Sequence, residues 1–97
     1  MELLTKELKK QLPPIYSTED IDYKDKVAVC KFFLTGTALT WYAVEFDPAT
    51  EEFFGLIDGY DKELGYFTMQ ELKSIRGQFN MPVERDLSFE PTKLKEL

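Results

Sequence analysis

The charged triplet Glu84-Arg85-Asp86 has the residue types that acid–base chemistry requires. On an extended strand, alternation places Glu84 and Asp86 on one face and Arg85 on the other. Two carboxylates beside a basic group can act as general acid and general base. The same pattern is also typical of a solvated strand face with a surface ion pair. An enzyme built on this chain would use these carboxylates together with Glu45 or Tyr42.

Other routes to catalysis have little support in the 97 residues. The chain contains no histidine, which excludes Ser-His and Cys-His nucleophilic mechanisms and imidazole metal ligands. Its one cysteine, Cys30, follows Ala28 and Val29, whose apolar character predicts a buried and unreactive thiol. Gly-rich phosphate loops and nucleophile-elbow motifs are absent. The sequence therefore predicts no catalytic residue and no enzyme.

A metal site is not expected either. Asp20-x-Asp22 has the spacing of the first two ligands of a calcium loop, but Lys24 occupies the place of the third ligand and the required glycine is missing. We predict no metal and no cofactor.

Acidic charge is concentrated in the middle of the chain. The formal net charge is −6, and residues 27–63 hold seven acidic and two basic side chains. Such a surface repels phosphate backbones, which makes direct nucleic-acid binding unfavourable. It is either a solubilising face or a surface that docks on a basic protein partner.

Aromatic side chains occur in adjacent pairs on the predicted strands, as in Trp41-Tyr42 and Phe53-Phe54. Neighbouring strand residues point to opposite faces of a sheet. Two or three short helices would cover one face, which leaves the other either to loops and the C-terminal segment or to a protein partner.

The candidate interaction residues combine the acidic middle, the aromatic pairs and the charged triplet. They are Trp41, Tyr42, Glu45, Glu51, Glu52, Phe53, Asp58, Asp61, Glu63, Glu84, Arg85 and Asp86.

Two helices are predicted from their caps. Thr5 is expected to cap a short helix that ends before Pro13-Pro14, with one stripe of leucines at four-residue spacing. Thr68-Met69-Gln70-Glu71 matches the capping box and predicts a helix over 69–76, with Gly77 just past its C-terminus.

Runs of β-branched and aromatic residues predict strands over 26–34, 39–46, 52–57 and 64–67. Their short links imply an antiparallel meander. Residues 83–89 read as an extended stretch, and 92–97 as a short turn or helix. The fold class is α+β: a small antiparallel sheet of three to five strands with a central meander, packed by two or three short helices. We expect one domain over residues 1–97.

No targeting or membrane segment is expected, because an acidic residue comes near the N-terminus and every apolar run is of strand length. We therefore predict a cytoplasmic protein, monomeric or homodimeric.

Three segments carry a family resemblance: Thr40-Trp41-Tyr42-Ala43, Glu63-Leu64-Gly65-Tyr66-Phe67 and Pro82-Val83-Glu84-Arg85-Asp86. With them, nearly the whole chain resembles a bacterial family known as domain of unknown function 2958. Relatives are often carried on plasmids, phages and integrative elements, so the resemblance implies an accessory role in a mobile genetic element. It brings no established catalytic or binding residues.

The leading functional hypothesis is a small protein-interaction module that is an accessory factor of a mobile genetic element. One alternative is an inhibitor that imitates a few phosphates of a nucleic acid and blocks a host defence nucleoprotein complex. Another is an enzyme that uses the carboxylates named above.

Overall fold

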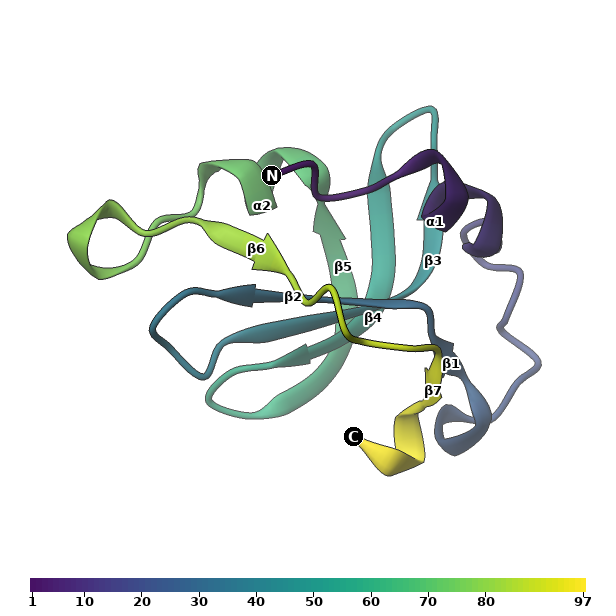
Figure 1. Cartoon of the computed structure of the whole chain (residues 1–97). Coiled ribbons are helices and arrows are strands. Elements are labelled where there is room, and N and C mark those ends of the chain that lie inside the picture. Colours follow the sequence, from purple (N-terminus) through teal and green to yellow (C-terminus); the bar gives the residue numbers. More distant parts are fainter.

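A computed structural model describes residues 1–97, and its centre is a five-stranded antiparallel sheet (Figure 1). Four strands follow one another as a meander: β2 Cys30–Leu34, β3 Thr40–Asp47, β4 Glu52–Asp58 and β5 Lys62–Thr68. A fifth, β6 (Val83–Arg85), pairs antiparallel with β2, so the order across the sheet is β5-β4-β3-β2-β6. The predicted α+β class with a central meander is confirmed.

Both predicted helices form with the expected caps. In α1 (Lys6–Gln11) the Thr5 hydroxyl oxygen accepts from the amide of Leu8, and in α2 (Met69–Ser74) that of Thr68 accepts from the amide of Glu71. Three single 3₁₀ turns complete the helical elements: η1 Tyr23–Asp25, η2 Gln78–Asn80 and η3 Leu94–Glu96. None of these helices has both the length and the apolar character that crossing a lipid bilayer requires.

The prediction for the end of α2 is wrong in detail. Regular helix stops at Ser74, and Gly77 has φ −95°, so it is not a left-handed cap. The last carbonyls are instead satisfied by Arg76, whose guanidinium donates to the backbone oxygens of Lys73 and Ile75. The chain then makes a tight turn in which Phe79 and Asn80 both have positive φ.

The strand predicted over 26–34 is divided into two. Residues Val27–Ala28 form β1, which pairs with β7 (Thr92–Lys93) in a separate two-stranded sheet, and β2 begins only at Cys30. The partner strand comes from the C-terminal segment, a long-range contact that residues 26–34 could not reveal.

The extended stretch predicted over 83–89 is also shorter than expected. Strand β6 ends at Arg85, because the Asp86 carboxylate accepts from the amide and the hydroxyl of Ser88 and turns the chain away from the sheet.

The two faces of the sheet carry separate cores, as the paired aromatics predict. The first face is the larger, and α1, α2 and the N-terminal segment cover its aromatic cluster. The strand residues in this cluster include Phe32, Trp41, Ala43, Phe46, Phe53 and Phe67. On the second face, Tyr42, Val44 and Leu56 pack with Ala28 and Leu94.

The C-terminal segment covers part of the second face. The rings of Tyr42 and Phe89 lie 5.9 Å apart, and Phe89 and Leu97 pack against the second cluster. Of the aromatics on this face, Tyr66 on β5 remains 48% exposed. The most exposed aromatic side chain that a strand presents on this face is therefore on β5.

Candidate functional site

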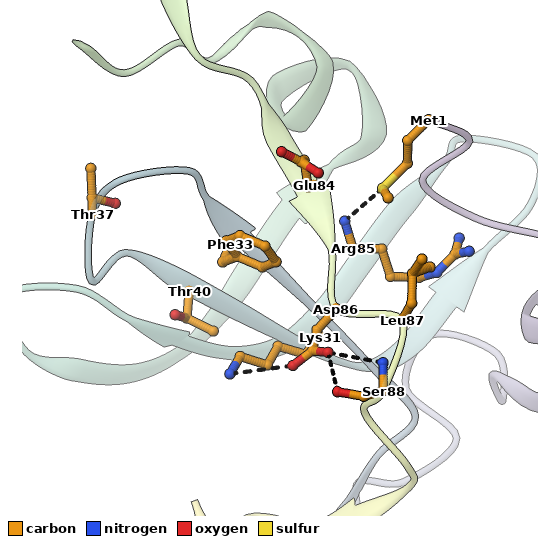
Figure 2. A pocket seen from close by; sticks show the side chains of 10 residues that line it. All are labelled: Met1, Lys31, Phe33, Thr37, Thr40, Glu84, Arg85, Asp86, Leu87 and Ser88. Carbon is orange, nitrogen blue, oxygen red and sulfur yellow. Dashed lines mark hydrogen bonds and ion pairs between the residues drawn. The ribbon is translucent and has the colours of Figure 1, made fainter.

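The predicted Glu84-Arg85-Asp86 triplet lines an open groove beside β6, shown in Figure 2, with a volume of about 620 Å³. Lys31 and Phe33 on β2 contribute to the same groove. We call it the β6 groove. Its lining residues are Met1, Lys31, Phe33, Thr37, Thr40, Glu84, Arg85, Asp86, Leu87 and Ser88.

Each charged side chain of the triplet is engaged within the chain. Glu84 Oε2 accepts from the Thr35 hydroxyl at 2.9 Å. The Arg85 guanidinium donates to the backbone oxygens of Glu2 and Leu3 at 2.7 and 2.8 Å. Asp86 forms an ion pair with the Lys31 ammonium at 3.7 Å.

Hydrogen bonds from Ser88 hold the pKa of Asp86 below its ordinary value, with a smaller contribution from Lys31. An ionised carboxylate held in this way accepts hydrogen bonds and orders the backbone around it. The triplet thus anchors β6 to β2 and to the N-terminal segment, and its geometry supports a structural role.

A β-bulge in β3 determines where Glu45 lies. The pairing of β3 with β4 shifts between Ala43, opposite Gly55, and Glu45, opposite Phe54, so Val44 has no partner. Regular alternation would put Glu45 on the first face with Trp41 and Ala43. The extra residue instead turns it to the second face.

There Glu45 is buried, with 2% of its surface exposed, and it holds the loop that precedes β1. Its carboxylate accepts from the amides of Tyr16 at 2.8 Å and Thr18 at 3.0 Å, and from the Thr18 hydroxyl. The buried Lys26 ammonium donates to the carbonyl and hydroxyl oxygens of Thr18. Glu45 was expected on the interaction surface. It is instead the centre of a buried network in which the Glu45 carboxylate and the Lys26 ammonium both hydrogen-bond to Thr18.

The Glu45 network holds the backbone of Tyr16, whose side chain lies in solvent. Tyr16, whose amide is bound by Glu45, has φ +72°, a left-handed conformation that a bulky residue rarely adopts. Its ring meets that of Tyr66 edge to face at 6.4 Å, and Tyr66 also packs on Phe54 at 5.1 Å. Tyr16 and Tyr66 are 61% and 48% exposed, so they form an accessible aromatic pair.

Three carboxylates act on Tyr66 of this pair through their charge. Desolvation raises the pKa of the Tyr66 hydroxyl, and Tyr16, Glu45, Glu19 and Glu52 raise it further through their charge. Beside Tyr66 on the same strand, Leu64 is 39% exposed. We refer to Tyr16, Glu19, Glu52, Leu64 and Tyr66 together as the β5 surface.

A hollow of about 490 Å³ continues the β5 surface at one end. Tyr16, Glu52 and Thr68 line it together with Pro14 and Asp47. A side chain that enters this hollow meets an aromatic ring and two carboxylates, which is an environment suited to a cation.

The other predicted acidic residues do not gather at one place. Glu51 and Glu52 lie at the turn between β3 and β4, whereas Asp58 and Asp61 lie at the opposite end of β4, around the turn into β5. Glu63 is exposed on β5 itself. The acidic middle of the sequence thus borders β4 and β5 at both ends.

Besides Glu45, four predicted or considered residues are inside the protein: Trp41, Tyr42, Phe53 and Cys30. Trp41 and Phe53 belong to the first-face core, with 5% and 0% exposed, and Tyr42 is covered by the C-terminal segment. Their inclusion on an interaction surface was wrong, because the helices and the C-terminal chain reach both faces. Burial raises the pKa of the Cys30 thiol to about 12, as expected for an unreactive core cysteine.

Four exposed members of the β5 surface are absent from the predicted interaction residues: Tyr16, Glu19, Leu64 and Tyr66. Tyr16 belonged to a loop with no regular pattern, and nothing local signals its positive φ. For Leu64 and Tyr66 the available signal was the alternation within 64–67, which puts Leu64 and Tyr66 on one face and Phe67 on the other.

Comparison with known proteins agrees with the resemblance noted above. No curated protein and no solved structure matches the chain. A family model described as "Protein of unknown function (DUF2958)" matches residues 3–95, which is nearly the whole chain. The protein therefore belongs to the DUF2958 family.

Proposed function

We propose that this protein is a small interaction module that binds a basic protein partner through the β5 surface. The observation that carries the proposal is the exposed Tyr16–Tyr66 pair bordered by Glu19 and Glu52. Exposed aromatic rings supply binding energy at protein interfaces, and a carboxylate border selects a partner of opposite charge.

Two lysines on this side of the sheet, Lys26 and Lys62, are engaged within the chain and form no ion pair with Glu19 or Glu52. Lys26 is buried against Thr18 and lies over the Phe54 ring at 5.8 Å. The Lys62 ammonium donates to the backbone oxygen of Leu97 at 2.6 Å. The carboxylates of the β5 surface are therefore left for a partner.

The biological setting that we propose is a mobile genetic element, in which the protein is an accessory factor. Its support is the resemblance of nearly the whole chain to a family often carried on such elements. A basic partner fits that setting, since proteins that handle nucleic acids carry clusters of lysine and arginine.

The alternative of a nucleic-acid mimic has less support. Duplex DNA carries about one negative charge per 1.7 Å of axis. The acidic residues here separate into groups at opposite ends of β4, with aromatic and aliphatic side chains between them.

Affinity capture with matched variants tests the proposal. The bait is compared with the double variant Glu52→Lys/Tyr66→Ser and with the control Glu7→Lys/Tyr60→Ser. The control makes the same chemical changes at two exposed residues outside the β5 surface. We expect bacterial lysate to yield a basic protein that the wild type and the control retain and the β5 variant loses.

The captured protein is then purified and titrated by calorimetry. An affinity that falls by about tenfold or more in the β5 variant, and that weakens with salt, agrees with the proposal. Equal binding by all three baits would contradict it.

A further inference from the structure

The two edges of the main sheet differ in how they are protected. β6 is three residues long and follows Pro82, and its Arg85 amide is covered by the Met1 sulfur at 3.1 Å. β5 is seven residues long, contains no proline and pairs with β4 without a bulge. Natural proteins block sheet edges with short strands, prolines, bulges and charged side chains. β5 carries charged residues only at its first two positions, Lys62 and Glu63, and has none of the other devices.

The register identifies which groups of β5 face outward. The Met69 amide donates to the Glu51 carbonyl, which places odd-numbered residues of this segment in hydrogen-bonded pairs with β4. The amides and carbonyls of Lys62, Leu64 and Tyr66 therefore point away from β4. No other part of the chain forms a hydrogen bond with them.

The side chains of Leu64 and Tyr66 favour one kind of strand at the free edge of β5. Leu64 and Tyr66 project onto the second face, where Tyr66 stands against Tyr16 and within reach of the charges of Glu19 and Glu52. A strand added beside β5 would place alternate side chains next to these residues. Lysine or arginine at those positions would contact both aromatic rings and carboxylates.

A second copy of the chain fits this edge poorly. Antiparallel pairing of two β5 strands about Gly65 would place Glu63 opposite Phe67 and Lys62 opposite Thr68, without any pair of opposite charges. It would also bring together two chains that each carry a net charge of −6.

Resting on the function proposed above, we propose that β5 accepts an extended basic segment of the protein partner as a sixth strand of the sheet. Backbone hydrogen bonds to Leu64 and Tyr66 supply the affinity, as in other cases of strand addition. Basic side chains of the segment lie on the Tyr16–Tyr66 pair and reach the hollow lined by Glu52 and Thr68.

Peptide binding tests the strand. The probe is a nine-residue peptide of alternating Lys and Val, and its control is the same peptide with N-methyl groups on alternate amides. Methylation keeps the charge and side chains but removes the donors along one edge. We expect the control to bind about tenfold more weakly or worse, and the amides of Leu64 and Tyr66 to exchange more slowly when the unmethylated probe is bound.

The variant Leu64→Pro removes one outward amide of β5 and leaves the inward bonds to β4 in place, because proline is tolerated where an edge-strand amide faces solvent. We expect about tenfold weaker probe binding. Leu64→Lys, which retains the backbone donor and repels a basic strand, provides a second test if the proline variant does not fold.

The outcomes separate this inference from the proposed function. Equal binding of both peptides, with unchanged exchange at Leu64 and Tyr66, would overturn strand addition while a charge-dependent partner in lysate still supported the β5 surface. No binding of the probe at millimolar concentration, or a stable homodimer that protects the same two amides, would also overturn it.

Discussion

Glu45 is the residue that determines the position of the loop carrying Tyr16. It accepts three hydrogen bonds from Tyr16 and Thr18 in a buried site, and Thr18 in turn binds the Lys26 ammonium. Buried polar groups are costly when one partner is removed, because the remaining donors lose water without gaining an acceptor.

Replacement of Glu45 by Gln is therefore expected to destabilise the fold. One carboxylate oxygen becomes an NH₂ group that faces backbone donors, and the charge opposite Lys26 is lost. We expect a loss of about 2–3 kcal/mol in the free energy of unfolding, measured by urea titration. Glu52→Gln, on the partly exposed start of β4, is the control and should change stability by no more than about 0.5 kcal/mol. Equal effects of the two substitutions would contradict the role of the network.

Asp86 leads to a pH-dependent prediction. Its folded pKa is lowered, above all by the Ser88 hydroxyl, so its contribution to stability is present above the unfolded pKa, near 3.8, and is lost as the pH falls through the folded pKa. Ser88→Ala should raise the pKa of Asp86, seen by NMR titration of the carboxyl carbon. The wild type should have the larger free energy of unfolding at pH 7. Its advantage over Ser88→Ala should narrow as the pH is lowered to 3.

The control for Asp86 is Ser74→Ala, which removes a hydroxyl that binds only the Glu71 carbonyl in α2. This variant should leave the Asp86 titration unchanged. A pKa that is the same in wild type and Ser88→Ala would show that the hydroxyl does not stabilise the carboxylate.

At the scale of elements, the β-bulge in β3 depends on a glycine in β4. A Cβ built on Gly55 would lie 1.8 Å from the Tyr42 carbonyl oxygen, a backbone atom that has no room to move. Its pairing partner on β5 is Gly65. A Cβ built on Gly65 would lie 3.4 Å from the flexible end of the Ile57 side chain. These two paired glycines therefore differ in what they tolerate.

Gly55→Ala is expected to destabilise the protein by about 3 kcal/mol or more, because β3 and β4 must separate to admit the methyl group. Gly65→Ala is the matched control and should cost no more than about 1 kcal/mol. Urea unfolding of both variants measures the difference. Similar stabilities would mean that β3 can shift its backbone at the bulge.

For the whole molecule, the net charge of −6 and the acidic border of β4 and β5 predict no retention of DNA. A mobility-shift titration with a duplex at about 150 mM salt should show free DNA at every protein concentration. Retention that disappears as salt is raised would reveal a basic contact surface and contradict the proposed choice of partner.

Local chemistry determined much of the fold in advance. The caps at Thr5 and Thr68, the proline pair after Leu12 and the alternating strands with short links each act over a few residues, so the helices and the meander could be predicted. The same alternation predicted that Trp41 and Tyr42 point to opposite faces, because side-chain direction on a strand has period two.

Tertiary contacts decided what remained: the division of 26–34 by β7, the early end of β6, and the burial of Trp41, Tyr42 and Phe53. They also moved Glu45 from the expected surface into the interior, since one unpaired residue in β3 reverses the alternation beyond it. Composition alone determined that the protein is acidic and lacks histidine. Only the folded chain could place Tyr16 against Tyr66 beside an open strand, because that contact joins residues fifty positions apart through a buried carboxylate.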